Sequence, residues 1–141
     1  MDDPMTTEPP DPGRPVYALA YKPVPEAAVA TRVLLREALT EWQMADLIDG
    51  SALVATELVS NAIRSDDNIA LEICPITTGG ARFLRIEVFD TSPELPKQRD
   101  GDLLDESGKG LQLVAAFADD WGHRLVDDGK IVWAVIGPAA R

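Results

Sequence analysis

The sequence predicts an α+β domain, a two-layer sandwich in which a mixed, mostly antiparallel sheet is covered on one face by about three helices. Apolar residues recur at helical spacing in three segments. Four alternating segments form two consecutive pairs, each joined by a glycine-containing turn, which is typical of hairpins. The 141 residues suit a single hydrophobic core. Helices packed on one face of such a sheet bury both apolar surfaces.

The first predicted helix begins at Pro25, a residue favoured in the first helical turn. Its expected inner face is Ala28, Thr31, Leu35, Leu39 and Trp42. The second helix is expected over residues 47–64, with Val54, Leu58 and Ala62 on its apolar arc. The third opens at Gly108 and buries Val114 and its neighbours at helical spacing.

The predicted strands cover residues 16–21, 69–73, 83–89, 124–126 and 131–136. In the third of them Leu84, Ile86 and Val88 alternate with more polar residues, which is the pattern of a strand with one buried face. Two segments read as hairpin turns, residues 77–80 and 127–130.

Domain organisation follows from the same pattern. Residues 1–14 are acidic and rich in proline and are expected to be a disordered tail, whereas residues 15–141 form one domain. Between the predicted strand ending at Asp90 and the third helix, residues 91–107 carry no regular pattern. A loop of that length in a small domain is usually functional or mobile.

Composition excludes several classes of function. The net charge of −11 argues against a general nucleic-acid binder and against binding to anionic lipid, because both need clustered lysine and arginine. Cys74 is the only cysteine, and we expect a small buried strand residue with no disulfide. No apolar run is long enough to span a bilayer, and the first residues do not resemble a signal peptide, so a cytoplasmic protein is expected.

Glu57 and Asn61 are the first candidate site residues. They are four residues apart on the second predicted helix and therefore face the same way, at the border of its apolar arc. An asparagine carbonyl oxygen suits Mg²⁺, and a glutamate can accept a proton from an attacking hydroxyl. On the pair alone, a solvated helix edge is the stronger interpretation.

Two further candidates follow along the chain. Asp90 ends a predicted strand, where its carboxylate can accept a hydrogen bond from an adenine amino group or cap the next turn. Gly108, Lys109 and Gly110 precede a helix whose first turn favours phosphate, although a flexible helix entry is an equal alternative.

The order of these elements resembles the GHKL ATP-binding fold of histidine kinases, gyrases and Hsp90-type chaperones. The chain looks most like the small stand-alone members, the anti-sigma-factor serine kinases and related actinobacterial regulatory ATP-binding proteins. The resemblance covers roughly residues 24–136. It is carried by ATELVSNAIRS at 55–65, FDTSPELP at 89–96, ESGKGLQLVAAFADDWG at 106–122 and GKIVWAV at 129–135.

The resemblance implies a role for each matching residue. Asn61 would coordinate Mg²⁺ between the nucleotide phosphates, and Glu57 would be the catalytic base towards a partner serine. Asp90 would bind the adenine amino group, and residues 91–107 would form the lid over ATP. The remaining residues of the implied cofactor-binding set are Ser92, Gly108, Lys109, Gly110 and Leu111.

The chain departs from the family pattern at the adenine end. Ser92 and Glu94 stand where many relatives have glycine, Ile131 where they have threonine, and Ser65 where they commonly have histidine. The implied cofactors are ATP and Mg²⁺, and the implied partner is a sigma factor or an anti-anti-sigma factor. Two functions stay open: a serine/threonine kinase acting in transcription regulation, and a weakly active or inactive module of the same fold that sequesters its partner. Relatives often dimerise, so a homodimer is compatible with the resemblance.

Overall fold

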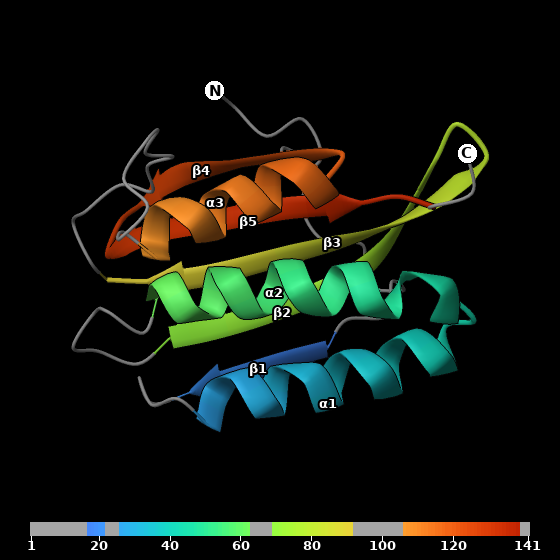
Figure 1. Cartoon of the computed structure of the whole chain (residues 1–141), viewed down its shortest axis with the longest axis horizontal. Coiled ribbons are helices and arrows are strands. Elements are labelled where there is room, and N and C mark those ends of the chain that lie inside the picture. The colour runs from blue at the N-terminus through green and yellow to red at the C-terminus, as the bar shows by residue number, and fades with distance from the viewer. Residues whose placement is uncertain (1–16, 22–25, 63–68, 92–105, 139–141) are drawn as a thin grey trace.

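We describe the chain from a computed structural model, in which residues 17–21, 26–62, 69–91 and 106–138 are placed well enough to describe. The expected tail of residues 1–14 lies outside these residues, as do 92–105 of the expected lid. Among the described residues the chain folds into one five-stranded sheet and three α-helices (Figure 1). The predicted α+β class is confirmed.

The sheet has the strand order β1-β2-β3-β5-β4, and each described pairing is antiparallel. Its strands are β1 (Tyr17–Tyr21), β2 (Ile69–Thr78), β3 (Ala81–Asp90), β4 (Asp120–Val126) and β5 (Gly129–Ile136). Gly79 and Gly80 join β2 to β3 with φ of +59° and +80°, a left-handed conformation that glycine adopts without strain. The predicted hairpins are therefore both present.

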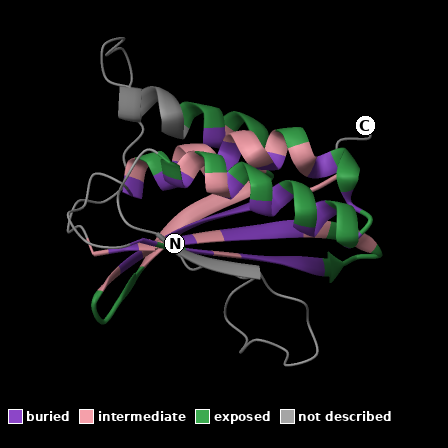
Figure 2. Cartoon of the chain, turned by 90° about the horizontal axis from the view of Figure 1, so that it is seen from below, coloured by how far each residue is buried: buried purple, intermediate pink, exposed green. Residues whose placement is uncertain are grey.

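The three helices lie on one face of the sheet (Figure 2). They are α1 (Glu26–Glu41), α2 (Ile48–Ala62) and α3 (Glu106–Phe117), and a short 3-10 turn (Ala45–Leu47) leads into α2. After α1, Gln43 adopts φ +60° and the amide of Met44 donates to the carbonyl of Leu39. This left-handed ending turns the chain from α1 towards α2.

The hydrophobic core lies between this helix layer and the sheet. The sheet contributes alternate residues of β2, β3 and β5, which the strand period of two places on the same face. The fully buried residues of β2 and β3 on this face are Ile69, Leu71, Ile73, Leu84, Ile86 and Val88. The helices contribute one stripe each, with Leu35 and Leu39 on α1, Val54 and Leu58 on α2 and Val114 on α3.

Three sequence predictions are corrected in detail. β2 continues to Thr78, beyond the predicted end at residue 73. Cys74, Pro75 and Ile76 are all buried, so this part of the strand lacks the alternation of polarity from which a strand is predicted. Ala27 takes the fully buried position on α1, whereas Ala28 is half-buried. The third helix begins at Glu106, two residues before Gly108.

Candidate functional site

One end of the molecule collects the elements that carry the candidate residues. There α2 ends, β3 ends, α3 begins and the β4–β5 hairpin turns, at the left of Figure 1. The helix α2 packs against α3, β3 and β5, so these elements are neighbours in space. Segments that are far apart in the sequence therefore meet at one edge of the sandwich.

Glu57 and Asn61 lie on the last two turns of α2 at this end. Both are half-buried, and Leu58 and Ala62 beside them are buried in the core. The prediction that the pair borders the apolar arc is confirmed. A carboxylate and an amide oxygen are hard ligands and can serve a magnesium ion or an attacking hydroxyl.

Asp90 forms a buried ion pair with Lys130. The Nζ atom of Lys130 lies 2.6 Å from Oδ1 of Asp90, and the two side chains are only 7% and 4% exposed. The two residues are directly opposite each other on β3 and β5, and both point to the helix-covered face. The carboxylate is therefore held in place by a cation that the sequence did not indicate as a site residue.

The backbone also approaches closely at this point. A side chain on Gly129 would overlap the carbonyl oxygen of Asp90, and would lie 3.0 Å from the Cα atom of Thr91. Gly129 is thus required where β5 begins beside the end of β3. The end of β3 and the start of β5 form one tightly packed corner.

Ile131, which stands where relatives have threonine, does not face the Asp90 carboxylate. Ile131 pairs with Phe89, whereas Asp90 pairs with Lys130. Neighbouring residues of a strand point to opposite faces, so Ile131 points away from Asp90. The absence of threonine at position 131 consequently has no direct effect on the surroundings of the carboxylate.

The glycine-rich segment lies in the first turns of α3, since Gly108, Lys109, Gly110 and Leu111 all belong to that helix. Their backbone thus stands at the same end of the molecule as the end of α2. Ser92, the remaining residue of the predicted cofactor-binding set, lies outside the described residues. So do Ser65 and Glu94, two of the positions where the chain departs from the family pattern.

The other residues whose side chains could react or bind a ligand lie within the sheet. His123 lies in β4 opposite Val132, and Trp133 and Cys74 are buried in the sheet, as expected of a structural cysteine. Among the described residues, no three histidine, cysteine, aspartate or glutamate side chains come together as a metal site. None of the described helices is long and apolar enough to cross a membrane.

Comparison with known proteins assigns no family. No protein-family model matches the sequence, and no curated protein matches it significantly. A functional proposal for this chain therefore depends on its own residues and on the motifs they form.

Proposed function

We propose that the protein is an ATP-binding regulator of the GHKL type, which binds MgATP at the end of the sandwich where α2, β3 and α3 meet. The observation that carries the proposal is the convergence of the ends of these elements. They bring Glu57 and Asn61, Asp90, and the glycine-rich turn of α3 to one end of the fold. Motifs that are separated along the sequence thus belong to elements that meet at one end of the fold.

The α2 and α3 side of the site suits the phosphates and the metal. Asn61 offers a carbonyl oxygen to Mg²⁺, and Glu57 lies one helical turn before it. The first turn of α3 presents backbone N–H groups, which favour an anion, and its glycines permit close approach. When bound, Mg²⁺ would neutralise phosphate charge, while Asn61 holds the ion and Glu57 orients or deprotonates a hydroxyl.

The β3 side of the site suits a purine amino group. Asp90 accepts a hydrogen bond from Lys130, and a carboxylate, with about four lone-pair positions, is able to accept hydrogen bonds from more than one donor. Because Asp90 is buried and its orientation is fixed by an ion pair, it is a preorganised acceptor. Lys130 would hold this carboxylate in a fixed orientation.

Calorimetric titration with ATP in Mg²⁺ tests the proposal. We expect binding by the full chain and a loss of roughly tenfold in affinity, about 1.4 kcal/mol, for Asn61→Ala. Ser60→Ala is the matched control, because Ser60 is the exposed neighbour on the same helix. Unchanged affinity in Asn61→Ala, or no binding by the wild-type chain, would refute the proposed site.

Two activities fit a protein of this kind, and Glu57 separates them. A serine/threonine kinase would transfer phosphate to a partner such as an anti-anti-sigma factor, and Glu57→Gln would abolish transfer while ATP still binds. A sequestering module would bind a sigma factor with little or no transfer.

Labelled transfer to candidate partners distinguishes these activities. Transfer that depends on Glu57 supports the kinase, and transfer that survives Glu57→Gln excludes it as the base. Cytoplasmic location, action in transcription regulation and homodimer formation belong to the same proposal. Sedimentation of the chain with and without ATP measures its oligomeric state directly.

A further inference from the structure

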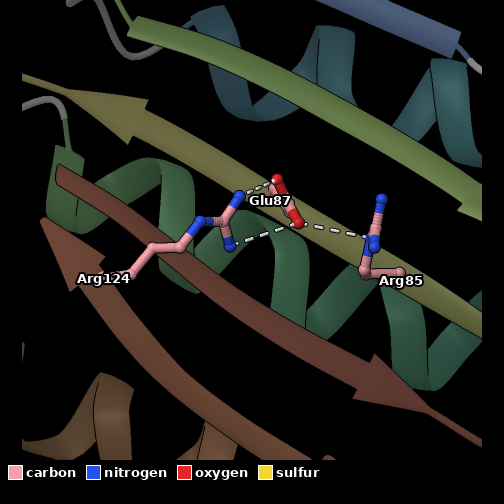
Figure 3. A network of polar contacts seen from close by, with 3 residues as sticks. All are labelled: Arg85, Glu87 and Arg124. Carbon is pink, nitrogen blue, oxygen red and sulfur yellow. Dashed lines mark hydrogen bonds and ion pairs between the residues drawn. The ribbon is translucent and has the colours of Figure 1, made fainter. Parts of the chain in front are cut away.

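Two acidic residues of β3 form ion pairs on opposite faces of the sheet. Glu87 lies on the face away from the described helices and contacts two guanidinium groups, those of Arg124 on β4 and Arg85 (Figure 3). Since β5 lies between β3 and β4, this network already joins three strands through side chains. Asp90 pairs instead with Lys130 on the helix-covered face, at 2.6 Å.

The second ion pair interrupts an apolar pattern. On the helix-covered face the residue before Asp90 on β3 is Val88, and the residue after Lys130 on β5 is Val132, and both valines belong to the core. Replacing a buried ion pair by apolar residues of similar volume is often neutral or stabilising. Two apolar side chains would therefore continue this face without a loss of stability, so the charges call for a further explanation.

The pair places a hydrogen-bond donor and an acceptor side by side. The ammonium group of Lys130 has three N–H donors, and a carboxylate can accept from more than one donor. Their spacing is set by the backbone, because the two residues are directly opposite each other and an added Cβ atom on Gly129 would overlap the carbonyl oxygen of Asp90. A rigid donor beside a rigid acceptor suits recognition of one edge of a nucleobase.

The row that contains the pair opens to solvent at β4. Leu125 is directly opposite Lys130, so Asp90, Lys130 and Leu125 form one row on the helix-covered face. Leu125 is 70% exposed, which shows that solvent reaches this face beside the lysine. An apolar side chain there can contact the flat face of a base while the charged pair contacts its edge.

Adenine and guanine present opposite groups at position 6 of the purine ring. Adenine has an amino donor beside the acceptor N1, whereas guanine has the acceptor O6 beside the donor N1–H and a second donor in its 2-amino group. A carboxylate alone accepts from the adenine amino group and repels the guanine oxygen. A carboxylate with an ammonium group beside it suits guanine too, because O6 then has a charged donor and the N–H groups have a charged acceptor.

We propose that Lys130 is a base-specificity residue that admits a guanine nucleotide, GTP, to the site. This inference rests on the nucleotide site proposed above. With guanine, Lys130 donates to O6 and Asp90 accepts from N1–H. With adenine, Asp90 accepts from the amino group and Lys130 donates to N1. The site therefore takes both purines, whereas a carboxylate with an uncharged neighbour would prefer adenine.

Calorimetric titration of the wild-type chain with GTP and with ATP, both in Mg²⁺, tests this inference. We expect the two affinities to lie within about tenfold of each other. A larger preference for ATP would overturn the role of Lys130 and leave the proposed ATP site intact. Binding of GTP without binding of ATP would support the role of Lys130 and refute the adenine site. Binding of neither nucleotide would overturn both proposals.

Inorganic tripolyphosphate is the control for binding through the phosphates alone. Because it has no base, we expect it to bind at least about tenfold more weakly than GTP. Equal binding of tripolyphosphate and GTP would overturn the proposal, since the base would then contribute nothing.

Substitution of Lys130 provides a second test, whose readout is the ratio of the GTP affinity to the ATP affinity. A general loss of stability lowers both affinities and leaves this ratio unchanged. Lys130→Met removes the donor to O6 and should lower the ratio by about tenfold or more. Lys130→Arg keeps a cation with N–H donors and should recover most of that loss. An unchanged ratio in Lys130→Met, or an equal fall in both variants, would overturn the proposal.

Discussion

Lys130 and Asp90 pair across the start of β5 and the end of β3, with 2.6 Å between Nζ and Oδ1 and both side chains more than nine-tenths buried. They belong to strands that are far apart in sequence and lie at the end of the sandwich where the proposed nucleotide site is found. The pair therefore has two effects. It joins the end of β3 to the start of β5, and it fixes the carboxylate that we propose binds the purine.

Lys130→Met should lower the free energy of unfolding by about 3–5 kcal/mol, because it leaves the Asp90 carboxylate buried without its cation. Methionine keeps most of the length of the lysine side chain, so the loss reports on charge more than on packing. Urea unfolding followed by circular dichroism measures it.

The double variant Lys130→Met with Asp90→Leu is the control for this prediction. Replacing both charges by apolar groups removes the unpaired carboxylate, so we expect at least half of the lost stability to return. A double variant that is less stable than Lys130→Met would show that packing, and not charge, explains the first result.

Glu87 should matter more for stability than Arg124, although the two form one ion pair. Glu87 is 12% exposed and lies between two guanidinium groups, whereas the Arg124 side chain is 31% exposed. We expect Glu87→Gln to cost about 1.5–3 kcal/mol, because it weakens charge-assisted hydrogen bonds of a nearly buried group. Arg124→Gln should cost less than about 1 kcal/mol, as is usual for exposed pairs. Equal losses in urea unfolding would contradict this ranking.

The sequence predicts the layers of this fold because helical and strand periods are both visible in it. The glycine pair at 79–80 marks the β2–β3 turn, and the alternation around Ile86 marks a half-buried strand. The start of β4 has no such signal. Its residues Trp121, Gly122 and His123 do not alternate in polarity. Gly122 pairs with Trp133 on β5, and an added Cβ atom would lie 2.8 Å from Cζ2 of that indole, a contact that the sequence does not reveal.

The candidate site, like the fold, is predictable from the sequence only in part. The positions of Glu57 and Asn61 follow from the period of one helix, which the sequence contains. The pairing of Asp90 with Lys130 depends on the register between β3 and β5, where a shift of one residue exchanges the faces. A predicted four-residue turn over 127–130 removes Lys130 from the strand, whereas the structure has a two-residue turn and begins β5 at Gly129.

Gly129→Ala should be strongly destabilising, because the added methyl group would overlap the backbone of Asp90. We expect a loss of about 1–3 kcal/mol or more as the two strands separate at this corner. Thermal unfolding measures it. Under the proposed function, ATP affinity should fall together with stability.

Gly50→Ala is the matched control for that substitution. A Cβ atom on Gly50 meets nothing within 4 Å, and the residue lies in the first turn of α2. Because alanine loses less backbone entropy in a helix, we expect a gain of about 0.5–1 kcal/mol. Similar losses for both variants would contradict the steric explanation for Gly129.

Ser51→Ala should leave stability unchanged or raise it by up to about 1 kcal/mol. The Ser51 hydroxyl is fully buried in α2, and its oxygen has no hydrogen-bond partner among the described residues. Removing an unsatisfied buried hydroxyl has little penalty, and alanine has the higher helix propensity. Thr31→Val on α1 provides the contrast, because the Thr31 hydroxyl is equally buried but donates to the carbonyl of Ala27 at 2.7 Å. That variant should lose about 1 kcal/mol. A loss of the same size in Ser51→Ala, measured by urea unfolding, would mean that its hydroxyl does form a hydrogen bond in solution.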